Sequence, residues 1–197
     1  APSWKPWNPA PLPVTSITTM NTEHHRPRIS AFLALSLDGF IAGEGNDLAW
    51  LDPYNGDSQE ETGYGALMTS ADLLLMGRNS YDVVRAFPEW PYGDKPVTVL
   101  THRPATPRAH VSFRQGALAQ VLSELWQEGA RHIYLDGGEV VRQGLQAGLV
   151  DELTLFWVPV TLGGGIPLFT GPLPAGLRPV SSAVLPSGLV RVIYHPA

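Results

Sequence analysis

Apolar and polar residues follow one another along this chain in the pattern of strands separated by helices. Residues 29–37 form a nearly continuous apolar run, as is typical of a strand covered on both faces. Further on, the apolar residues of the segment 118–126 recur at the spacing that places them on one face of a helix. This alternation predicts an α/β fold in which helices link and cover the strands of a mostly parallel sheet.

The remaining elements are shorter and are bounded mostly by glycine or proline. The segments expected to form strands are 73–76, 97–100, 133–135, 153–160, 183–185 and 189–194, and helices are expected at 60–70, from Tyr81 onward, at 118–126 and over about nine residues after Gly138. The sequence Pro186-Ser187-Gly188 between the last two strands is a hairpin signal. It predicts that the C-terminal edge of the sheet is antiparallel.

The first 27 residues differ from the rest of the chain, because they are rich in proline and polar residues and show no hydrophobic period. They are predicted to form a flexible extension. The length of 197 residues, with 44% hydrophobic residues, suits one sizeable core rather than two. Residues 28–197 are therefore expected to form a single domain.

Composition narrows the possible functions. The formal net charge of −5 argues against binding along a nucleic acid. With no cysteine, the chain has neither a disulfide framework nor thiolate ligands for zinc. No apolar run approaches the roughly 20 residues of a membrane helix, and the N-terminus lacks a secretory signal pattern. We therefore expect a cytoplasmic protein without a metal, membrane or nucleic acid partner.

Residues that suit an anionic ligand follow three of the predicted strands. Residues 77–80 place a glycine and an arginine at the start of a helix, residues 101–103 add a hydroxyl and a second arginine, and residues 136–139 place two glycines before another helix. Open α/β sheets bind their ligands at the carboxyl ends of strands. Any one of these segments is more often an ordinary turn with a solvated charge. Their occurrence at successive strand ends favours a nucleotide site.

Five segments of the chain carry a resemblance to a known family. They are residues 36–42 (SLDGFIA), 75–81 (LMGRNSY), 99–101 (VLT), 135–138 (LDGG) and 158–169 (VPVTLGGGIPLF). In this order they resemble the riboflavin-biosynthesis reductase domains, the C-terminal domain of RibD, a family related to dihydrofolate reductase. The resemblance extends from about residue 28 to the C-terminus and is greatest to stand-alone members of the family.

The resemblance implies a dihydrofolate reductase-like, three-layer α/β/α fold with a sheet of about eight strands, mostly parallel and ending in an antiparallel C-terminal hairpin. It also implies that NADPH lies across the strand ends. The residues implied to bind this cofactor are Gly77, Arg78 and Asn79 at the phosphates, Thr101, His102 and Arg103 near the adenosine 2′-phosphate, Gly137, Gly138, Glu139 and Val140 at the pyrophosphate, Ala34 and Ile41 beside the nicotinamide, and Leu162 and Gly163 on a segment that could close over it. Arg78 and Arg103 would then set a preference for NADPH over NADH.

The substrate side is less defined by the sequence. The insertion 53–57 leaves no clear match to the carboxylate that grips the pterin in dihydrofolate reductase, which argues against folate. Asp38 follows the first strand, where a partly dry site would raise its pKa and let it donate a proton. The alternative is that Asp38 and Gly39 only form a turn. Ser36, Trp50 and Tyr64 are candidate substrate residues, although the two aromatic residues could equally belong to the core.

Together these features predict an NADPH-dependent oxidoreductase. It would transfer hydride to a C=N or C=O bond of a small heterocyclic or sugar-linked substrate, such as a riboflavin-pathway-like pyrimidine or pteridine. The alternatives are a non-catalytic NADP(H)-binding module and, less favoured, a phosphate-ligand transferase. The apolar stretches 153–160 and 189–194, with an exposed Trp157, predict a homodimer.

Overall fold

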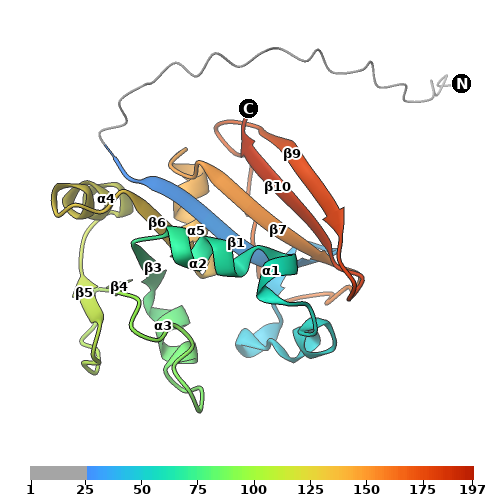
Figure 1. Ribbon diagram of the computed structural model, residues 1–197, viewed down its shortest axis with the longest axis horizontal. Coiled ribbons are helices and arrows are strands. Elements are labelled where there is room, and N and C mark those ends of the chain that lie inside the picture. Colours follow the sequence, from blue (N-terminus) through green and yellow to red (C-terminus); the bar gives the residue numbers. More distant parts are fainter. Residues whose placement is uncertain (1–25) are drawn as a thin grey trace, which may run out of the picture.

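The computed structural model describes residues 26–197, so the extension predicted for residues 1–27 lies almost entirely outside the described residues. The described chain forms an eight-stranded sheet, with helices on both faces, and a second, two-stranded sheet (Figure 1). The strand order in the large sheet is β5-β4-β3-β6-β1-β7-β10-β9. Neighbouring strands from β5 to β7 are parallel, whereas β10 is antiparallel to both β7 and β9. The predicted α/β class and its antiparallel C-terminal edge are confirmed.

The elements are distributed over the whole described chain. The strands of the large sheet are β1 (Arg28–Ser36), β3 (Leu73–Gly77), β4 (Val97–Leu100), β5 (Val111–Arg114), β6 (His132–Asp136), β7 (Glu152–Val158), β9 (Leu177–Val184) and β10 (Val190–Pro196). The small sheet pairs β2 (Phe40–Ala42) with β8 (Ile166–Pro167). The helices are α1 (Gln59–Thr62), α2 (Tyr64–Ser70), α3 (Arg78–Val84), α4 (Leu118–Gln127) and α5 (Gly138–Gln146), with two 3-10 helices, η1 (Glu44–Asn46) and η2 (Ala49–Tyr54).

The two edge strands depart most from the hydrophobic pattern. β9 occupies Leu177–Val184 rather than 183–185, and most of its residues are exposed, so no apolar period marks it. β5, at the opposite edge, has no fully buried residue. The helix expected at 60–70 is divided at Gly63, whose φ of 84° ends α1 before α2 begins. Trp157, expected to be exposed, is half-buried and packs against the core.

The central strand β1 shows how the sheet separates two cores. Ile29 and Leu35 are fully buried in the core formed with α4 and α5. Phe32 points to the opposite face, where the ring of Tyr64 from α2 packs at a centroid distance of 5.5 Å. Because successive residues of a strand point to opposite faces, both faces of the sheet need a helical cover. α1, α2 and α3 lie on one side of the sheet and α4 and α5 on the other (Figure 1).

The carboxyl ends of the central strands lie side by side. β3 ends at Gly77 and β6 ends at Asp136, and each strand is followed directly by a helix, α3 or α5. β1 lies on the other side of β6 and leads through a turn at Asp38 and Gly39 into β2. The segments predicted to bind an anionic ligand follow β3, β4 and β6. They therefore lie together at the edge of the sheet formed by the carboxyl ends of these strands.

Candidate functional site

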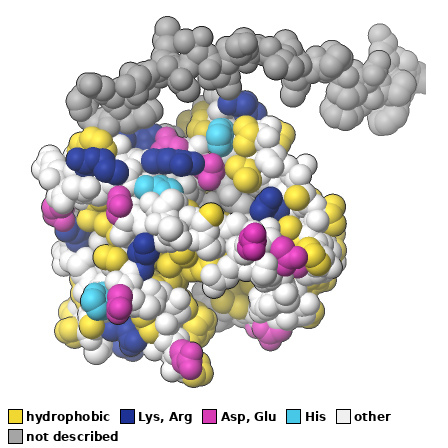
Figure 2. Space-filling model, in the orientation of Figure 1, with side chains coloured by type: hydrophobic (Ala, Val, Ile, Leu, Met, Phe, Trp, Pro, Cys, Tyr) yellow, Lys and Arg dark blue, Asp and Glu magenta, His cyan; other side chains and the backbone are white. Residues whose placement is uncertain are grey.

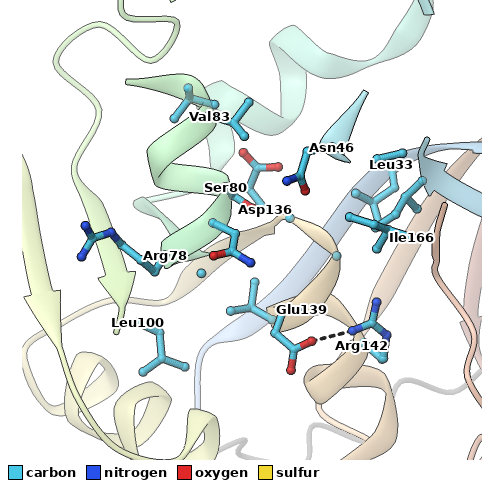
Figure 3. A pocket seen from close by; sticks show the side chains of 18 of the residues that line it. Leu33, Asn46, Arg78, Ser80, Val83, Leu100, Asp136, Glu139, Arg142 and Ile166 are labelled. Atoms are coloured by element: carbon cyan, nitrogen blue, oxygen red, sulfur yellow. Dashed lines mark hydrogen bonds and ion pairs between the residues drawn. The ribbon is translucent and has the colours of Figure 1, made fainter. Parts of the chain in front are cut away.

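A cavity of about 720 Å³ opens at the carboxyl ends of β1, β3, β4 and β6 (Figure 3). This volume lies within the usual range for small-molecule and cofactor sites. The cavity brings together most of the residues predicted to bind the cofactor, namely Ala34, Ile41, Gly77, Arg78, Asn79, Thr101, His102, Arg103, Gly137, Gly138, Glu139 and Val140. Segments far apart in sequence thus meet in one site.

The other predicted site residues do not line this cavity, and these are Ser36, Asp38, Trp50, Tyr64, Leu162 and Gly163. Trp50 packs in a hydrophobic cluster with Phe156 of β7. Tyr64 packs between sheet and helix, with its ring 6.4 Å from that of Tyr134. Both aromatic side chains therefore lie in the packed core, which was the alternative to a substrate wall.

The backbone at Gly137 and Gly138 packs closely against neighbouring side chains of the cavity. A Cβ atom on Gly137, whose φ is 91°, would lie 1.9 Å from Oγ of Ser80, and one on Gly138 would lie 2.0 Å from Cδ1 of Ile41. α5 begins here without a side-chain cap, so the N–H groups of its first turn have no partner within the helix. Only glycine therefore fits against Ser80 and Ile41 at these two positions, and the N–H groups of the first turn suit the pyrophosphate of a dinucleotide.

Glu139 introduces a negative charge at the same helix end, and Arg142 compensates for it. Nη1 of Arg142 lies 2.5 Å from Oε2 of Glu139, and its Nη2 donates to the carbonyl oxygen of Pro167 at 2.8 Å. Arg142 also lines the cavity. Arg142 is not among the residues predicted from the sequence, although its spacing of three residues from Glu139 on a helix indicates such a pair.

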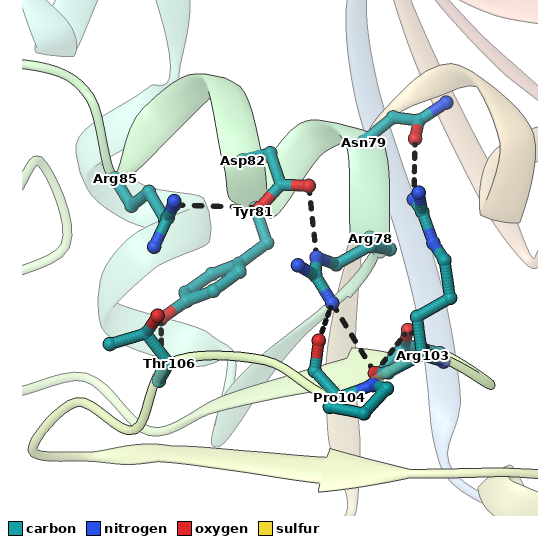
Figure 4. Close-up of polar contacts among 9 residues, drawn as sticks. Arg78, Asn79, Tyr81, Asp82, Arg85, Arg103, Pro104 and Thr106 are labelled. Atoms are coloured by element: carbon teal, nitrogen blue, oxygen red, sulfur yellow. Dashed lines mark hydrogen bonds and ion pairs between the residues drawn. The ribbon is translucent and has the colours of Figure 1, made fainter.

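Arg78 is held by the protein itself rather than left free for a ligand (Figure 4). Its Nε donates to Oδ2 of Asp82 at 2.9 Å, and its Nη1 donates to the carbonyl oxygens of Pro104 at 2.5 Å and Arg103 at 3.3 Å. Arg103, by contrast, makes a single longer side-chain contact, from Nη2 to Oδ1 of Asn79 at 3.3 Å. The two arginines are therefore not equivalent, because Arg78 fixes the loop that carries Arg103.

The loop around Arg103 also borders a second, smaller hollow of about 280 Å³. It is lined by residues 101–105 together with Phe113 and Gln115, and it shares Thr101, His102 and Arg103 with the large cavity. An elongated ligand in the large cavity can therefore extend toward an exposed arginine.

Asp136, at the end of β6, is a half-buried acid in the wall of the cavity. Burial raises the pKa of its carboxyl group, although hydrogen bonds from Tyr92 and Tyr134 oppose the shift. Oη of Tyr92 donates to Oδ2 of Asp136 at 2.5 Å, and Tyr92 lines the cavity beside it. Asp136 belongs to the glycine motif but is not among the site residues predicted from the sequence, because the environment of a strand-end aspartate depends on neighbours such as Tyr92 that are distant in sequence.

Asp38 differs from the expectation in both place and electrostatics. Its carboxylate accepts hydrogen bonds from Oγ of Ser36 at 2.7 Å and from the backbone N–H groups of Gly163 at 2.7 Å and Leu162 at 3.0 Å. The Ser36 hydroxyl and these N–H groups lower the pKa of Asp38 from 3.8 to about 2. The predicted raised pKa is wrong, because donors surround an exposed carboxylate instead of an apolar wall. Asp38 fixes the segment of Leu162 and Gly163 onto the end of β1.

The strand order and the helices on both faces of the sheet give this chain a dihydrofolate reductase-like α/β fold. The chain belongs to the RibD C-terminal domain family, whose model matches residues 27–191.

Individual relatives agree with this assignment. YwjB of Bacillus subtilis (strain 168) is 35% identical over 141 residues, which cover 70% of this chain and 80% of YwjB. The crystal structure of a Shewanella sp. PV-4 protein named for riboflavin biosynthesis superposes with a TM-score of 0.75 at 36% identity, covering 86% of this chain and 99% of that one. Dihydrofolate reductase from Enterococcus faecalis, in complex with NADP(H), shares the fold with a TM-score of 0.62 at 17% identity, covering 86% of this chain and 96% of that one.

Proposed function

We propose that this protein is an NADPH-dependent reductase that transfers hydride to a C=N or C=O bond of a small heterocyclic or sugar-linked molecule, such as a riboflavin-pathway-like pyrimidine or pteridine. The observation that carries the proposal is a single cavity in which an uncapped, glycine-lined helix N-terminus adjoins a half-buried acid with a raised pKa, Asp136. The first feature suits a dinucleotide and the second suits proton transfer. Membership of the RibD C-terminal domain family supports a reductase role.

The backbone at Gly137 and Gly138 would hold the pyrophosphate of the cofactor. Arg103, on the loop fixed by Arg78, would meet the 2′-phosphate that distinguishes NADPH from NADH. The remaining contacts proposed for the cofactor are Gly77, Asn79, Thr101 and His102 toward its phosphates, Glu139 and Val140 in the first turn of α5, Ala34 and Ile41 beside the nicotinamide, and the segment of Leu162 and Gly163 as a cover.

A reduced nicotinamide, when bound, supplies the hydride, and the protein must supply the proton. Because burial raises the pKa of Asp136, its carboxyl group retains a proton to higher pH than an ordinary aspartic acid does. Tyr92 donates to Oδ2 of Asp136 and fixes the orientation of the carboxyl group. Asp38, whose pKa is about 2, is a poorer proton donor than Asp136.

The cofactor is tested by calorimetric titration of the protein with NADPH and with NADH. NADPH is expected to bind more tightly, and Arg103→Ala is expected to weaken NADPH binding by about 1–3 kcal/mol while leaving NADH binding unchanged. Arg28→Ala is the matched control, because Arg28 carries the same charge at the opposite end of β1, where it pairs with Glu152. Equal affinities of the wild-type protein for NADPH and NADH would overturn the cofactor assignment.

The reaction is tested by single-turnover oxidation of bound NADPH in the presence of pteridines, pyrimidines and carbonyl compounds. A reductase oxidises NADPH with at least one of these compounds, and the product has gained two hydrogen atoms. Tight NADPH binding without oxidation by any compound would instead favour the non-catalytic module.

The homodimer and the cytoplasmic location remain proposals. At the edge strand β9, Val184 is 76% exposed, which is consistent with a surface that a second copy covers. Light scattering that gives twice the chain mass of 21.3 kDa would support the dimer. No helix in residues 26–197 has the length and apolarity needed to cross a membrane.

A further inference from the structure

The cavity has two chemically different halves. The glycine half is built around the strand ends at Gly77 and Gly137 and the N-terminus of α5. The apolar half is formed by β1, by the segment around η2 and by α3 with the residues after it, and its apolar lining consists of Phe32, Leu48, Leu51, Val83, Val84 and Phe87. Asp136 and Tyr92 lie between the halves, and Figure 3 shows Val83 on one side of Asp136 and Arg142 on the other.

The positive charges of the cavity all belong to the glycine half. Of the described residues, the lysine, arginine and histidine side chains that line the cavity are Arg78, His102, Arg103 and Arg142. Arg78 is bound to the loop at Pro104, and Arg142 is bound to Glu139 and to the carbonyl oxygen of Pro167. The polar residues beside the apolar half are Asn46, Tyr92 and Asp136, none of which carries a positive charge.

This distribution disfavours an anionic substrate. A phosphate or carboxylate that enters a partly dry site loses its hydration and needs cations or several N–H donors in compensation. In the apolar half it would meet hydrocarbon surface, and nearby it would meet the carboxyl group of Asp136. An uncharged molecule carries no such cost.

The mouth of the cavity exposes apolar surface that an uncharged ligand would cover. Leu48 is 37% exposed and Phe87 is 46% exposed, and both line the cavity from opposite walls. The space-filling view shows a hollow bordered by hydrophobic side chains between the part of the molecule that contains α3 and the part that contains η1 and η2 (Figure 2). Exposed apolar side chains gathered at a cavity mouth indicate a site for an apolar ligand.

We propose that the substrate of this protein is an uncharged carbonyl or imine compound without a phosphate or carboxylate group, bound in the apolar half of the cavity. The inference rests on the proposed reductase function and narrows its substrate class. In the reaction the carbon of the C=N or C=O bond receives a hydride, the nitrogen or oxygen receives a proton, and NADPH is oxidised to NADP⁺. A phosphorylated, sugar-linked pyrimidine falls outside this class, whereas its dephosphorylated form does not.

The test measures kcat/KM for NADPH oxidation with matched pairs of compounds that differ by one charged group. Suitable pairs are benzaldehyde with 4-carboxybenzaldehyde, and an imine of an aminopyrimidine and ribose with and without its 5′-phosphate. The uncharged member of each pair is expected to react with a kcat/KM at least about 10-fold higher. Equal or higher kcat/KM for the charged members would overturn the proposal.

If none of these compounds is reduced, a binding measurement tests the proposed substrate class instead. The uncharged dye Nile red is titrated into the NADP⁺-saturated protein, and its binding is expected to weaken about 10-fold or more in Phe87→Asp and in Leu48→Asp. Ser123→Asp adds the same charge on the exposed face of α4, away from the cavity, and this control should bind the dye as the wild-type protein does. Unchanged dye binding in both cavity variants would overturn the proposal. Displacement of the dye by uncharged members supports it, and displacement by charged members only, or by none, overturns it.

The NADPH titration described under the proposed function distinguishes a failure of the reductase function from a failure of the substrate class. If NADPH does not bind, the proposed function fails. If NADPH binds and the charged compounds are preferred, the substrate class fails and the reductase function stands.

Discussion

The ends of β1 and β6 carry the same dipeptide in two different settings. Asp38-Gly39 follows β1, and Asp136-Gly137 lies at the end of β6, with the glycine at a φ of 91° in both cases. Yet the pKa of Asp38 is lowered to about 2, whereas the pKa of Asp136 is raised. The dipeptide therefore determines the turn, but the surrounding residues determine the pKa of the aspartate.

The difference has a plain physical cause. The Asp38 carboxylate is exposed and accepts hydrogen bonds from Ser36, Leu162 and Gly163, which stabilise its charged form. The Asp136 carboxyl group is half-buried at the wall of the cavity, and the hydrogen bonds from two tyrosines do not offset the loss of hydration. One aspartate therefore orders a loop, and the other is suited to hold a proton.

The largest effect should come from Asp136→Asn. We expect this change to lower kcat by about 10²–10⁴-fold, the usual range for a general acid, because the amide cannot supply the proton. NADPH affinity should stay near the wild-type value, since Asn keeps the shape of the side chain and can still accept the hydrogen bond from Tyr92. Steady-state kinetics on any accepted substrate, with calorimetry for the cofactor, measures both quantities. Turnover close to the wild-type rate would remove Asp136 from the mechanism.

Gly39 and Gly137, the glycines of the two dipeptides, differ in the space around them. Gly137→Ala would place a methyl group 1.9 Å from Oγ of Ser80, whereas the same change at Gly39 meets no atom within 4 Å. Both glycines have a φ of 91°, which a Cβ atom disfavours in either variant. We expect Gly137→Ala to be about 1–3 kcal/mol less stable than Gly39→Ala, and to bind NADPH more weakly. Urea unfolding of both variants tests this, and equal stabilities would mean that Ser80 moves aside without cost.

The sequence predicted the central part of the fold better than the edges. Residues 29–37 are apolar because β1 is covered on both faces, and such a pattern can be read without a structure. β9 is largely exposed because it forms an edge. Its first residues show no alternation of apolar and polar positions, and the sequence therefore did not predict them as a strand. For the site, glycines after a strand indicated the ligand surface around Gly137. The pairing of Arg78 with Pro104 and the burial of Asp136 depend on contacts between distant segments, which no local pattern records.

Asp38→Asn should have a much smaller effect on turnover than Asp136→Asn. Asp38 does not line the cavity, and its amide replacement keeps an oxygen that can accept a hydrogen bond from Gly163 or Leu162. We expect kcat to fall by less than about 10-fold, through a less ordered segment at residues 162–163, whereas a general acid would be worth about 10²–10⁴-fold. Rapid-quench or steady-state measurement of kcat decides between the two roles. A loss of a hundredfold or more would restore Asp38 as the proton donor predicted from the sequence.

The smallest effect is the pH dependence of folding, in which the two aspartates should act in opposite directions. The pKa of Asp38 is lower in the folded protein than its ordinary value of 3.8, so its stabilising contribution is present above about pH 4 and is lost as the pH falls toward 2. The pKa of Asp136 is raised on folding, so its contribution is present at low pH and is lost as the pH rises through the raised value.

Urea unfolding of the wild-type protein and of the two Asn variants between about pH 3 and pH 7 measures both trends. The stability advantage of the wild-type protein over Asp38→Asn should shrink toward low pH, whereas Asp136→Asn should gain on the wild-type protein as the pH rises. Parallel pH profiles for the two variants would show that the strand ends do not differ as the structure indicates.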